Sequence, residues 1–370
     1  MMKRLIVFLD GTWNQPDDKK NATNVVKLMR AICPFDQDGV AQVTFYDKGV
    51  GTGGPIDRLS GGAFGRGLDD NVKDGYRFLA NNYVPGDEIY IFGFSRGAFT
   101  ARSLAGFMGA CGLLDKRTMG RLNEAWELYR TPPEERSDED KAEIRAISRY
   151  PVPIRCVGVW DTVGALGVPL GVMSAWNRRK FKFHDTTIGS NIDRAFHALA
   201  IDEQRGPFQP TLWQTPVPRD DQIVEQVWFA GVHSNIGGSY DDPGLSDIAL
   251  AWMIDRVDAE TALAFDPDYC ANNIKGDAAG TLYDSRSAMY AFSKIAPYAR
   301  LIGQADTGGG LANWLKRKLR PDTNRTFVNE MIHRSALDRL SSGGLIDGEG
   351  HSSYAPDNLT AAQGKLPVVD

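Results

Sequence analysis

Residues 88–107, EIYIFGFSRGAFTARSLAGF, place a G-x-S-x-G pattern between two apolar runs of different character. The run from Glu88 to Phe92 is typical of a buried strand, and the residues from Ala98 onward suit a helix packed against a sheet. Ser95 lies between them, with Gly93 and Gly97 two residues away on either side. A serine at a sharp turn from strand to helix predicts a nucleophile elbow.

The residue types around Ser95 fit this chemistry. The hydroxyl must stand out of a strained turn, and side chains at Gly93 and Gly97 would crowd it. Backbone N–H groups at the start of the helix point toward the oxygen that becomes negative during acyl transfer. We therefore expect Ser95 to be the nucleophile, Gly93 and Gly97 to support it, and the N–H of Arg96 to be one oxyanion-hole donor.

Strand-like and helix-like runs alternate through much of the chain. The expected strands are residues 4–9, 42–46, 88–92, 154–160 and 225–230, and the expected helices are 24–31, 69–83, 98–110 and 122–129. This alternation predicts the α/β class, with a mostly parallel, doubly wound sheet, helical insertions and an α/β-hydrolase-like architecture. Active residues in such sheets collect at the carboxyl ends of the strands.

The expected domain organisation is a core over residues 1–255 and a C-terminal extension, irregular or helical, over 256–370 that packs on the core. Residues 131–150 are highly charged and read as a solvated helical excursion. Residues 164–195 mix apolar side chains with a basic cluster at 178–180. They are interpreted as a lid insertion or, with equal weight, as surface loops.

Composition narrows the classes of function. The 370 residues are 42% hydrophobic and 24% charged, which is ordinary for a globular protein, and the net charge of −5 gives no reason to expect nucleic acid as a partner. The four cysteines are scattered and indicate neither a disulfide framework nor a zinc site. We expect no metal and no cofactor.

The N-terminal run Leu5 to Leu9 follows two basic residues but is too short for a signal peptide, and Asp10 ends it. It is interpreted as the first strand. No run in the chain approaches the length of a membrane span. The expected location is therefore cytoplasmic, with export only by a secretion system that needs no signal peptide.

A serine nucleophile needs a general base, and all five histidines follow Ser95 in the sequence. His233 follows a strand-like run and precedes a glycine-bearing loop, which is the position expected for the base. His333 is the reserve candidate. His184 and His351 lie in polar stretches, and His197 lies in a helix-like run, 194–201, where packing or capping is the expected role.

The acid is expected at Asp161, which directly follows the strand-like run 154–160. An ordinary helix cap or turn aspartate is the alternative reading of that position. Asp202 and Glu203 compete for the role but are expected in a helix or loop, away from a strand end.

A second oxyanion donor is expected from residues 10–14, directly after the first strand. The N–H of Gly11 or Thr12 is the candidate, with Asp10 in support. The alternative is a common tight turn. Residues 49–54 also satisfy G-x-G-x-x-G, but Pro55 follows where a helix should begin, so they are interpreted as a glycine loop and not as a dinucleotide site.

Several motifs recur together in one known family. They are L-D-G-T-W-N at 9–14, G-V-G-T at 49–52, G-F-S-R-G-A-F at 93–99, G-V-W-D-T-V-G at 158–164, H-A-L-A-I-D-E at 197–203 with Arg205, F-A-G-V-H-S-N-I-G-G at 229–238 and Y-A-P-D-N-L at 354–359. Over roughly its first 255 residues the chain resembles the α/β-hydrolase family that includes the catalytic domain of type VI secretion phospholipase effectors.

The resemblance implies a lipase or esterase with Ser95, Asp161 and His233 as its triad. It also leads us to expect an ester or lipid substrate and transient contact with a membrane surface. An immunity protein or a secretion adaptor as partner stays open, because the sequence does not support either. At Asn235 the family usually has aspartate. If that carboxylate were a working acid in relatives, it would compete with Asp161; otherwise Asn235 is a supporting residue.

The sequence thus predicts a metal-independent hydrolase of carboxylic esters, lipid-like acyl esters in particular. Two alternatives stay open. One is a non-catalytic binding or scaffold protein that retains the fold, and the other is a hydrolase of a different bond, such as an amide or a polyester.

Overall fold

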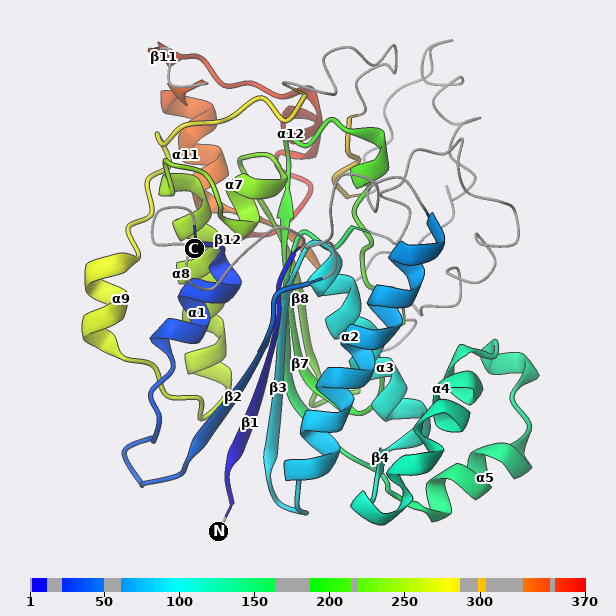
Figure 1. Cartoon of the computed structure of the whole chain (residues 1–370). Helices are drawn as coiled ribbons and strands as arrows, with labels where there is room; N and C mark the ends of the chain where they lie inside the picture. The colour runs from blue at the N-terminus through cyan, green and yellow to red at the C-terminus, as the bar shows by residue number, and fades with distance from the viewer. Residues whose placement is uncertain are drawn as a thin grey trace.

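The computed structural model describes residues 2–11, 22–49, 61–163, 187–214, 219–286, 299–303, 329–346 and 350–370. Within them, eight strands form one sheet in the order β12-β9-β8-β7-β6-β3-β1-β2, and every neighbouring pair is parallel (Figure 1). These strands are β1 (Arg4–Leu9), β2 (Gln42–Asp47), β3 (Glu88–Phe94), β6 (Ile154–Trp160), β7 (Ile192–Ala200), β8 (Ile223–Phe229), β9 (Glu330–His333) and β12 (Val368–Val369).

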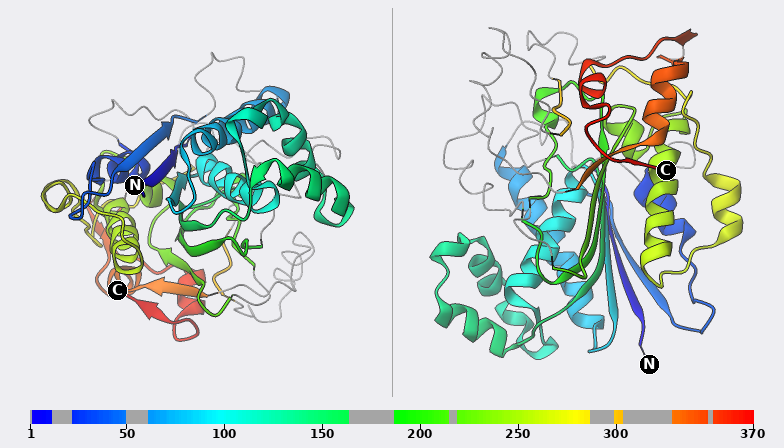
Figure 2. Two further views of the ribbon diagram at one scale, coloured as in Figure 1. Left: turned by 90° about the horizontal axis from the view of Figure 1, so that it is seen from below. Right: turned by 180° about the vertical axis from the view of Figure 1, so that it is seen from behind.

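Helices cover both faces of the sheet, as two views from opposite sides show (Figures 1 and 2). One face is covered by α1 (Asn24–Ala31) and α8 (Gly244–Glu260), with α9 (Pro267–Asn273) beside α1. The other is covered by α2 (Gly61–Asn82) and α3 (Arg96–Cys111), with α4 (Leu122–Arg130) and α5 (Asp138–Ala146) outside α3. The predicted α/β-hydrolase-like fold class is confirmed.

Shorter elements complete the described chain. They are β4 (Leu113–Leu114) paired with β5 (Ser148–Arg149), β10 (Gly344–Leu345) paired with β11 (His351–Ser352), the 3-10 helices η1 (Lys116–Arg121), η2 (Pro133–Glu135) and η3 (Gly206–Phe208), and the helices α7 (His233–Gly237), α11 (Arg334–Ser342) and α12 (Asp357–Ala362).

The first strand shows why the sheet lies between two helical layers. Leu5, Val7 and Leu9 belong to the buried cluster beneath α2 and α3. Ile6 and Phe8 belong to the cluster beneath α1 and α8. Both sets are almost fully buried, and since successive side chains of a strand point to opposite faces, a strand that is apolar throughout must be covered on both sides.

Two expectations differ from the structure. Residues 194–201, read as helix-like, belong mainly to β7, whose six last side chains are all buried. A central parallel strand covered on both faces lacks the alternation that marks a strand in sequence, and its alanines favour a helix reading. The expected boundary at residue 255 falls inside α8, and the extension beyond it is not only irregular or helical, because β9 and β12 join the main sheet.

Some expected features lie outside the described residues. They are Thr12, most of the glycine loop after Gly49, and residues 164–186 of the expected lid, with its basic cluster at 178–180. Among the helices that are described, none combines the length and the apolar character needed to cross a membrane.

Candidate active site

The elbow at Ser95 forms because two glycines allow close approaches. Ser95 has φ 60° and ψ −119°, between the end of β3 and the start of α3. A Cβ atom on Gly93 would lie 2.5 Å from the carbonyl oxygen of Gly97, and one on Gly97 would lie 2.0 Å from that of Leu9. Real Cβ contacts are never so short, so the turn requires glycine at both positions.

His233 lies at the carboxyl end of β8, as the first residue of α7. Gly231, with φ 128°, turns the chain between strand and helix. The side chain of Asn235 holds this turn: its Oδ1 accepts from the N–H of Val232 (3.2 Å), and its Nδ2 donates to Thr281 O (3.0 Å). Asn235 therefore fixes the loop that carries His233.

Asp161 directly follows β6 and has a positive φ of 39°. Its N–H donates to Ala198 O (2.8 Å), and its Oδ1 accepts from the N–H of Ala200 (3.1 Å). Because β3, β6, β7 and β8 are consecutive in the sheet, their carboxyl ends bring Ser95, Asp161 and His233 to one edge.

The three side chains form one hydrogen-bonded chain. His233 Nε2 lies 2.7 Å from Ser95 Oγ, and His233 Nδ1 lies 2.6 Å from Asp161 Oδ2. The imidazole lies against the rings of Phe94 and Phe208, at centroid distances of 4.7 and 5.0 Å. With Nδ1–H donating to the carboxylate, Nε2 is left to accept the serine proton.

Charges and burial set the protonation of this chain. Burial lowers the pKa of His233, and the adjacent Asp161 opposes that effect only in part. Burial by itself would raise the pKa of Asp161, but the Arg300 guanidinium and His233 outweigh it and hold that pKa below its usual range. At neutral pH the arrangement is therefore a carboxylate beside a neutral imidazole.

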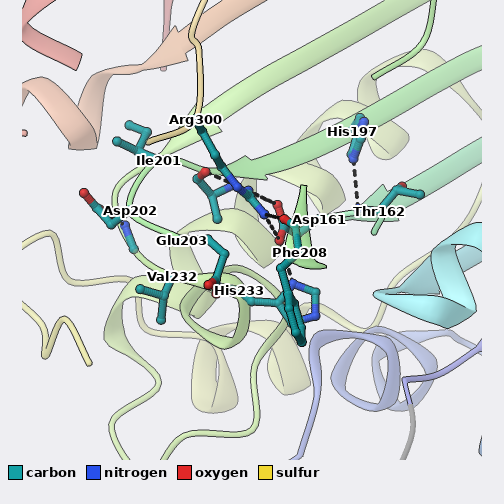
Figure 3. A network of polar contacts seen from close by, with 12 residues as sticks. Asp161, Thr162, His197, Ile201, Asp202, Glu203, Phe208, Val232, His233 and Arg300 are labelled. Carbon is teal, nitrogen blue, oxygen red and sulfur yellow. Dashed lines mark hydrogen bonds and ion pairs between the residues drawn. The ribbon is translucent and has the colours of Figure 1, made fainter. Parts of the chain in front are cut away.

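Arg300 also belongs to the site, although the sequence gives no prediction for it. Its guanidinium is bound to Asp161, with Nη1 2.6 Å from Oδ1 and Nη2 3.0 Å from Oδ2 (Figure 3). The stretch around it carries no motif, and 139 positions separate the two residues. A lone arginine in an irregular segment gives no sequence signal of this role.

The competing acids contact the backbone of the His233 loop. Contrary to expectation, Asp202 and Glu203 do follow a strand, β7. Glu203 accepts from the N–H of His233 (3.3 Å) and pairs with Arg205 (2.8 Å). Asp202 accepts from the N–H of Gly231 (2.6 Å) and from the hydroxyl of Tyr354 (2.8 Å). Asp161 is the carboxylate that contacts the imidazole.

The remaining histidines have other surroundings. His197, on β7, accepts the N–H of Thr162 at Nε2 (3.1 Å), and burial lowers its pKa to about 3, so it stays neutral. His333 caps α11 by accepting the N–H of Ser335, and its ring stacks on Phe229 at 4.5 Å. His184 and the side chain of His351 are outside the described residues.

The structure describes two of the three expected oxyanion donors, Arg96 and Gly11, and Thr12 lies outside the described residues. Arg96 begins α3, directly after Ser95. The loop at Asp10 lies against the elbow, since a Cβ on Gly97 would meet Asp10 O at 2.6 Å. The N–H of Gly11 donates to Asp10 Oδ1 (2.6 Å), and Thr23 and Tyr46 donate their hydroxyls to Asp10 Oδ2. Gly11 would have to exchange its bond to serve as a donor.

The sheet places this chain in the class of α/β-hydrolase-like proteins. At the carboxyl edge of the sheet, the side chains of Ser95, His233 and Asp161 are in contact. Residues 3–256 match the family described as "T6SS, Phospholipase effector Tle1-like, catalytic domain". The chain belongs to that family.

Two individual proteins similar to this chain share 30% and 16% of its residues over the regions that match. The "Uncharacterized protein YEL023C" of Saccharomyces cerevisiae is 30% identical over 239 residues, which covers 58% of this chain and 33% of the yeast protein. An uncharacterised protein from Pseudomonas aeruginosa has a structure with TM-score 0.44 and 16% identity, covering 75% of this chain and 49% of that one.

Two further structures are similar over much of this chain. The Tle1 effector bound to the VgrG spike of the type 6 secretion system gives TM-score 0.39 and 19% identity, covering 66% of this chain and 52% of that one. The apo form of Thermogutta terrifontis esterase 2 gives 0.35 and 12%, covering 71% and 85%. This chain thus spans a third of the yeast relative and about half of the first two structures.

Proposed function

We propose that this chain is a serine hydrolase that cleaves carboxylic esters, with lipid-like acyl esters as its substrates. The hydrogen-bonded chain from Asp161 through His233 to Ser95 supports the proposal most directly. Family membership supports the same class, because the family is described by phospholipase effectors.

In the proposed reaction, Ser95 Oγ attacks the ester carbonyl carbon while His233 Nε2 takes the hydroxyl proton. Asp161 keeps Nδ1 protonated and stabilises the imidazolium that forms. His233 then gives its proton to the leaving alkoxide as the ester C–O bond breaks, which leaves an acyl group on Ser95. Water, deprotonated by His233, attacks that acyl group and releases the acid, and the proton returns to Ser95.

The developing oxyanion needs donors at its own position. The N–H of Arg96 is the proposed first donor, and the N–H of Gly11 or Thr12 is the proposed second. Each donor of this kind contributes about 3 kcal/mol of transition-state stabilisation. The positive end of α3, which begins at Arg96, adds to the same field.

A cavity begins one helical turn beyond the elbow, at Phe99. It has a volume of about 260 Å³ and extends along α3 from Phe99 to Ala110. Its walls combine apolar side chains such as Phe99, Val157 and Trp213 with charged and polar ones, among them Arg102, Arg136, Arg145 and Asn191. Phe99 is one helical turn beyond Ser95 and donates its N–H to Ser95 O (3.3 Å).

The nucleophile is tested without knowledge of the substrate. A fluorophosphonate probe should label the wild-type protein at Ser95 and leave Ser95→Ala unlabelled. Ser103→Ala is the matched control, since Ser103 is a buried serine on α3 that donates to Phe99 O. Equal labelling of wild type and Ser95→Ala would contradict the proposal, and absence of labelling in the wild type would favour a scaffold.

The substrate class is tested with a panel of p-nitrophenyl esters from acetate to dodecanoate and with phosphatidylcholine and phosphatidylglycerol vesicles. We expect Ser95-dependent turnover that rises with acyl length. The panel also includes a p-nitroanilide and a polyester film. Turnover of either one, without turnover of any p-nitrophenyl ester or phospholipid, would replace the lipid assignment.

The setting is also a proposal. We infer that the protein acts at a lipid surface, reaches it through a secretion system that needs no signal peptide, and has an adaptor or immunity protein as partner, because the family is described by secretion effectors. Co-sedimentation with the same vesicles and secretion of a tagged chain by a host with and without its type VI apparatus measure these points.

A further inference from the structure

The carboxylate of Asp161 is bound on its far side by a second charged group. The Arg300 side chain is wholly buried, and its two terminal nitrogens contact the two carboxylate oxygens in a bidentate pair at 2.6 and 3.0 Å. Such a fork fixes the plane of a carboxylate as well as its charge. One of the two oxygens, Oδ2, also contacts His233 Nδ1.

The same guanidinium is fixed to the scaffold around the site. Its Nη1 donates to Ala200 O (2.8 Å), at the end of β7, and its Nη2 donates to Phe208 O (2.6 Å). The ring of Phe208 in turn lies against His233. Figure 3 shows Arg300 directed at Asp161, with His233 and Phe208 on the opposite side of the carboxylate. A single side chain thus joins three parts of the site.

The backbone of Arg300 is held by the C-terminal part of the chain. The amide of Asn358 donates to both Arg300 O (3.2 Å) and Ile201 O (3.0 Å). Ile302 is buried in the cluster with α11 and α12, and the N–H of Gly303 donates to Glu330 (3.0 Å). All of these residues except Ile201 lie beyond residue 256, where the family match ends.

We propose that Arg300 is a positioning residue, supplied from outside the matched catalytic domain, that orients Asp161 toward His233 and offsets its charge. The inference rests on the proposed function of the triad. With Arg300 present, the resting site holds a paired carboxylate and a neutral imidazole. Without it, the lone carboxylate would draw a proton onto His233.

Other groups around the imidazole are accounted for. Charged and titratable side chains near His233 and Asp161, apart from Arg300, are Glu203 with Arg205, Asp202, His197, Tyr240 and, next to Ser95 in the chain, Arg96. Glu203 is paired with Arg205, and His197 is neutral. Among the residues that the structure describes, Arg300 is therefore the cation paired with Asp161, and its removal leaves that carboxylate without this partner.

The test is the pH dependence of fluorophosphonate labelling, from pH 4 to 9, in Arg300→Gln and Arg300→Lys. Because neutral His233 is the active form, labelling falls as the pH drops below its pKa. In Arg300→Gln we expect labelling at pH 8 to slow at least ~10-fold and the midpoint of the acid limb to rise by about 1 pH unit. Arg300→Lys keeps the charge but loses the fork, so its midpoint should stay and its rate should fall.

Arg339→Gln is the matched control. Arg339 is also fully buried and donates to three carbonyl groups, of Ala278, Gly280 and Leu345, away from the triad. We expect it to lower thermal stability without moving the midpoint. An unchanged midpoint in Arg300→Gln, or wild-type labelling in Arg300→Lys, overturns the inference.

Should Arg300→Gln fail to fold, the rate of Arg300→Lys at its unchanged midpoint decides the question. A wild-type chain that takes no label, or takes it equally in Ser95→Ala, signals failure of the proposed function instead.

Discussion

Gly97 and Leu9 lie so close that a Cβ atom on residue 97 would stand 2.0 Å from the Leu9 carbonyl oxygen. Leu9 ends β1 and Gly97 is the second residue of α3, so the contact joins the first strand to the helix behind the nucleophile. It brings the Asp10 loop to the elbow, where the second oxyanion donor is expected. The glycine therefore serves the packing of two elements as well as access to Ser95.

Gly97→Ala should destabilise the protein by about 1–3 kcal/mol, because the added methyl group meets backbone atoms that cannot move aside as a side chain would. Urea unfolding measures the change. Gly120→Ala is the control: a Cβ there has nothing within 4 Å, and its φ is not positive. Equal stability of the two variants would contradict the close approach.

Because the backbone of Ser95 is strained, glycine at this position should give a more stable protein than alanine, which is the reverse of the order within a helix. With φ at 60°, a Cβ costs about 1–3 kcal/mol, and glycine avoids that cost. Ser95→Gly should thus be about 1 kcal/mol more stable than Ser95→Ala, after the greater unfolded-state entropy of glycine is subtracted.

At Ser103, which lies within regular helix, the order should be the opposite, with alanine the more stable by about 0.5–1 kcal/mol. Thermal unfolding of the four variants gives both differences. The same order at the two positions would show that Ser95 carries no strain.

The elbow and the three triad candidates could be predicted from sequence because each signal is local. Ser95, Asp161 and His233 each follow an apolar run closely, and parallel strands place such positions at one edge. The contacts between them then follow from strand order, which sequence alone did not supply. Their roles as nucleophile, acid and base stay predictions.

Other features have no local signal. Residues 194–201 suggest a helix because a strand buried on both faces lacks the alternation of apolar and polar residues that marks a strand. Asp202 and Glu203 are therefore expected in a helix or loop, although they follow strand β7. The role of Arg300 could not be predicted from the sequence. It depends on an ion pair with a residue 139 positions away and on burial of the side chain, and both exist only in the folded chain. Long-range ion pairs of this kind leave no periodic pattern.

The side chain of Asn235 bonds to Thr281, and this bond predicts what a change of Asn235 to aspartate would do here. Nδ2 donates to Thr281 O at 3.0 Å, whereas an ionised carboxylate would face that oxygen without a proton. Asn235→Asp should therefore cost about 1–3 kcal/mol at pH 7.5.

The pH dependence of this destabilisation follows from the raised pKa that we expect for the carboxyl group at position 235 of the Asn235→Asp variant. The cost is present while the aspartate is ionised and is lost as the pH falls and it becomes a donor. Urea unfolding of wild type and Asn235→Asp at pH 7.5 and 5 measures it. Fluorophosphonate labelling should be nearly unchanged, and restored labelling in Asp161→Asn/Asn235→Asp would move the acid role to position 235.

His197 predicts a dependence of stability on acid pH. Burial lowers its folded pKa to about 3 from the ordinary value of 6.5, so the unfolded chain takes up a proton at a pH where the folded chain does not. The stability contribution is complete above about pH 6.5 and is lost as the pH falls toward 3, at about 1.4 kcal/mol per pH unit.

In His197→Gln the amide oxygen can still accept the N–H of Thr162, but the side chain at position 197 no longer titrates. Between pH 6 and 4.5 the wild type should lose stability more steeply than this variant by that slope, while His233 and His333 contribute equally to both. Chemical unfolding at several pH values measures the two slopes, and parallel lines would show that His197 is protonated in the folded protein or is not buried there.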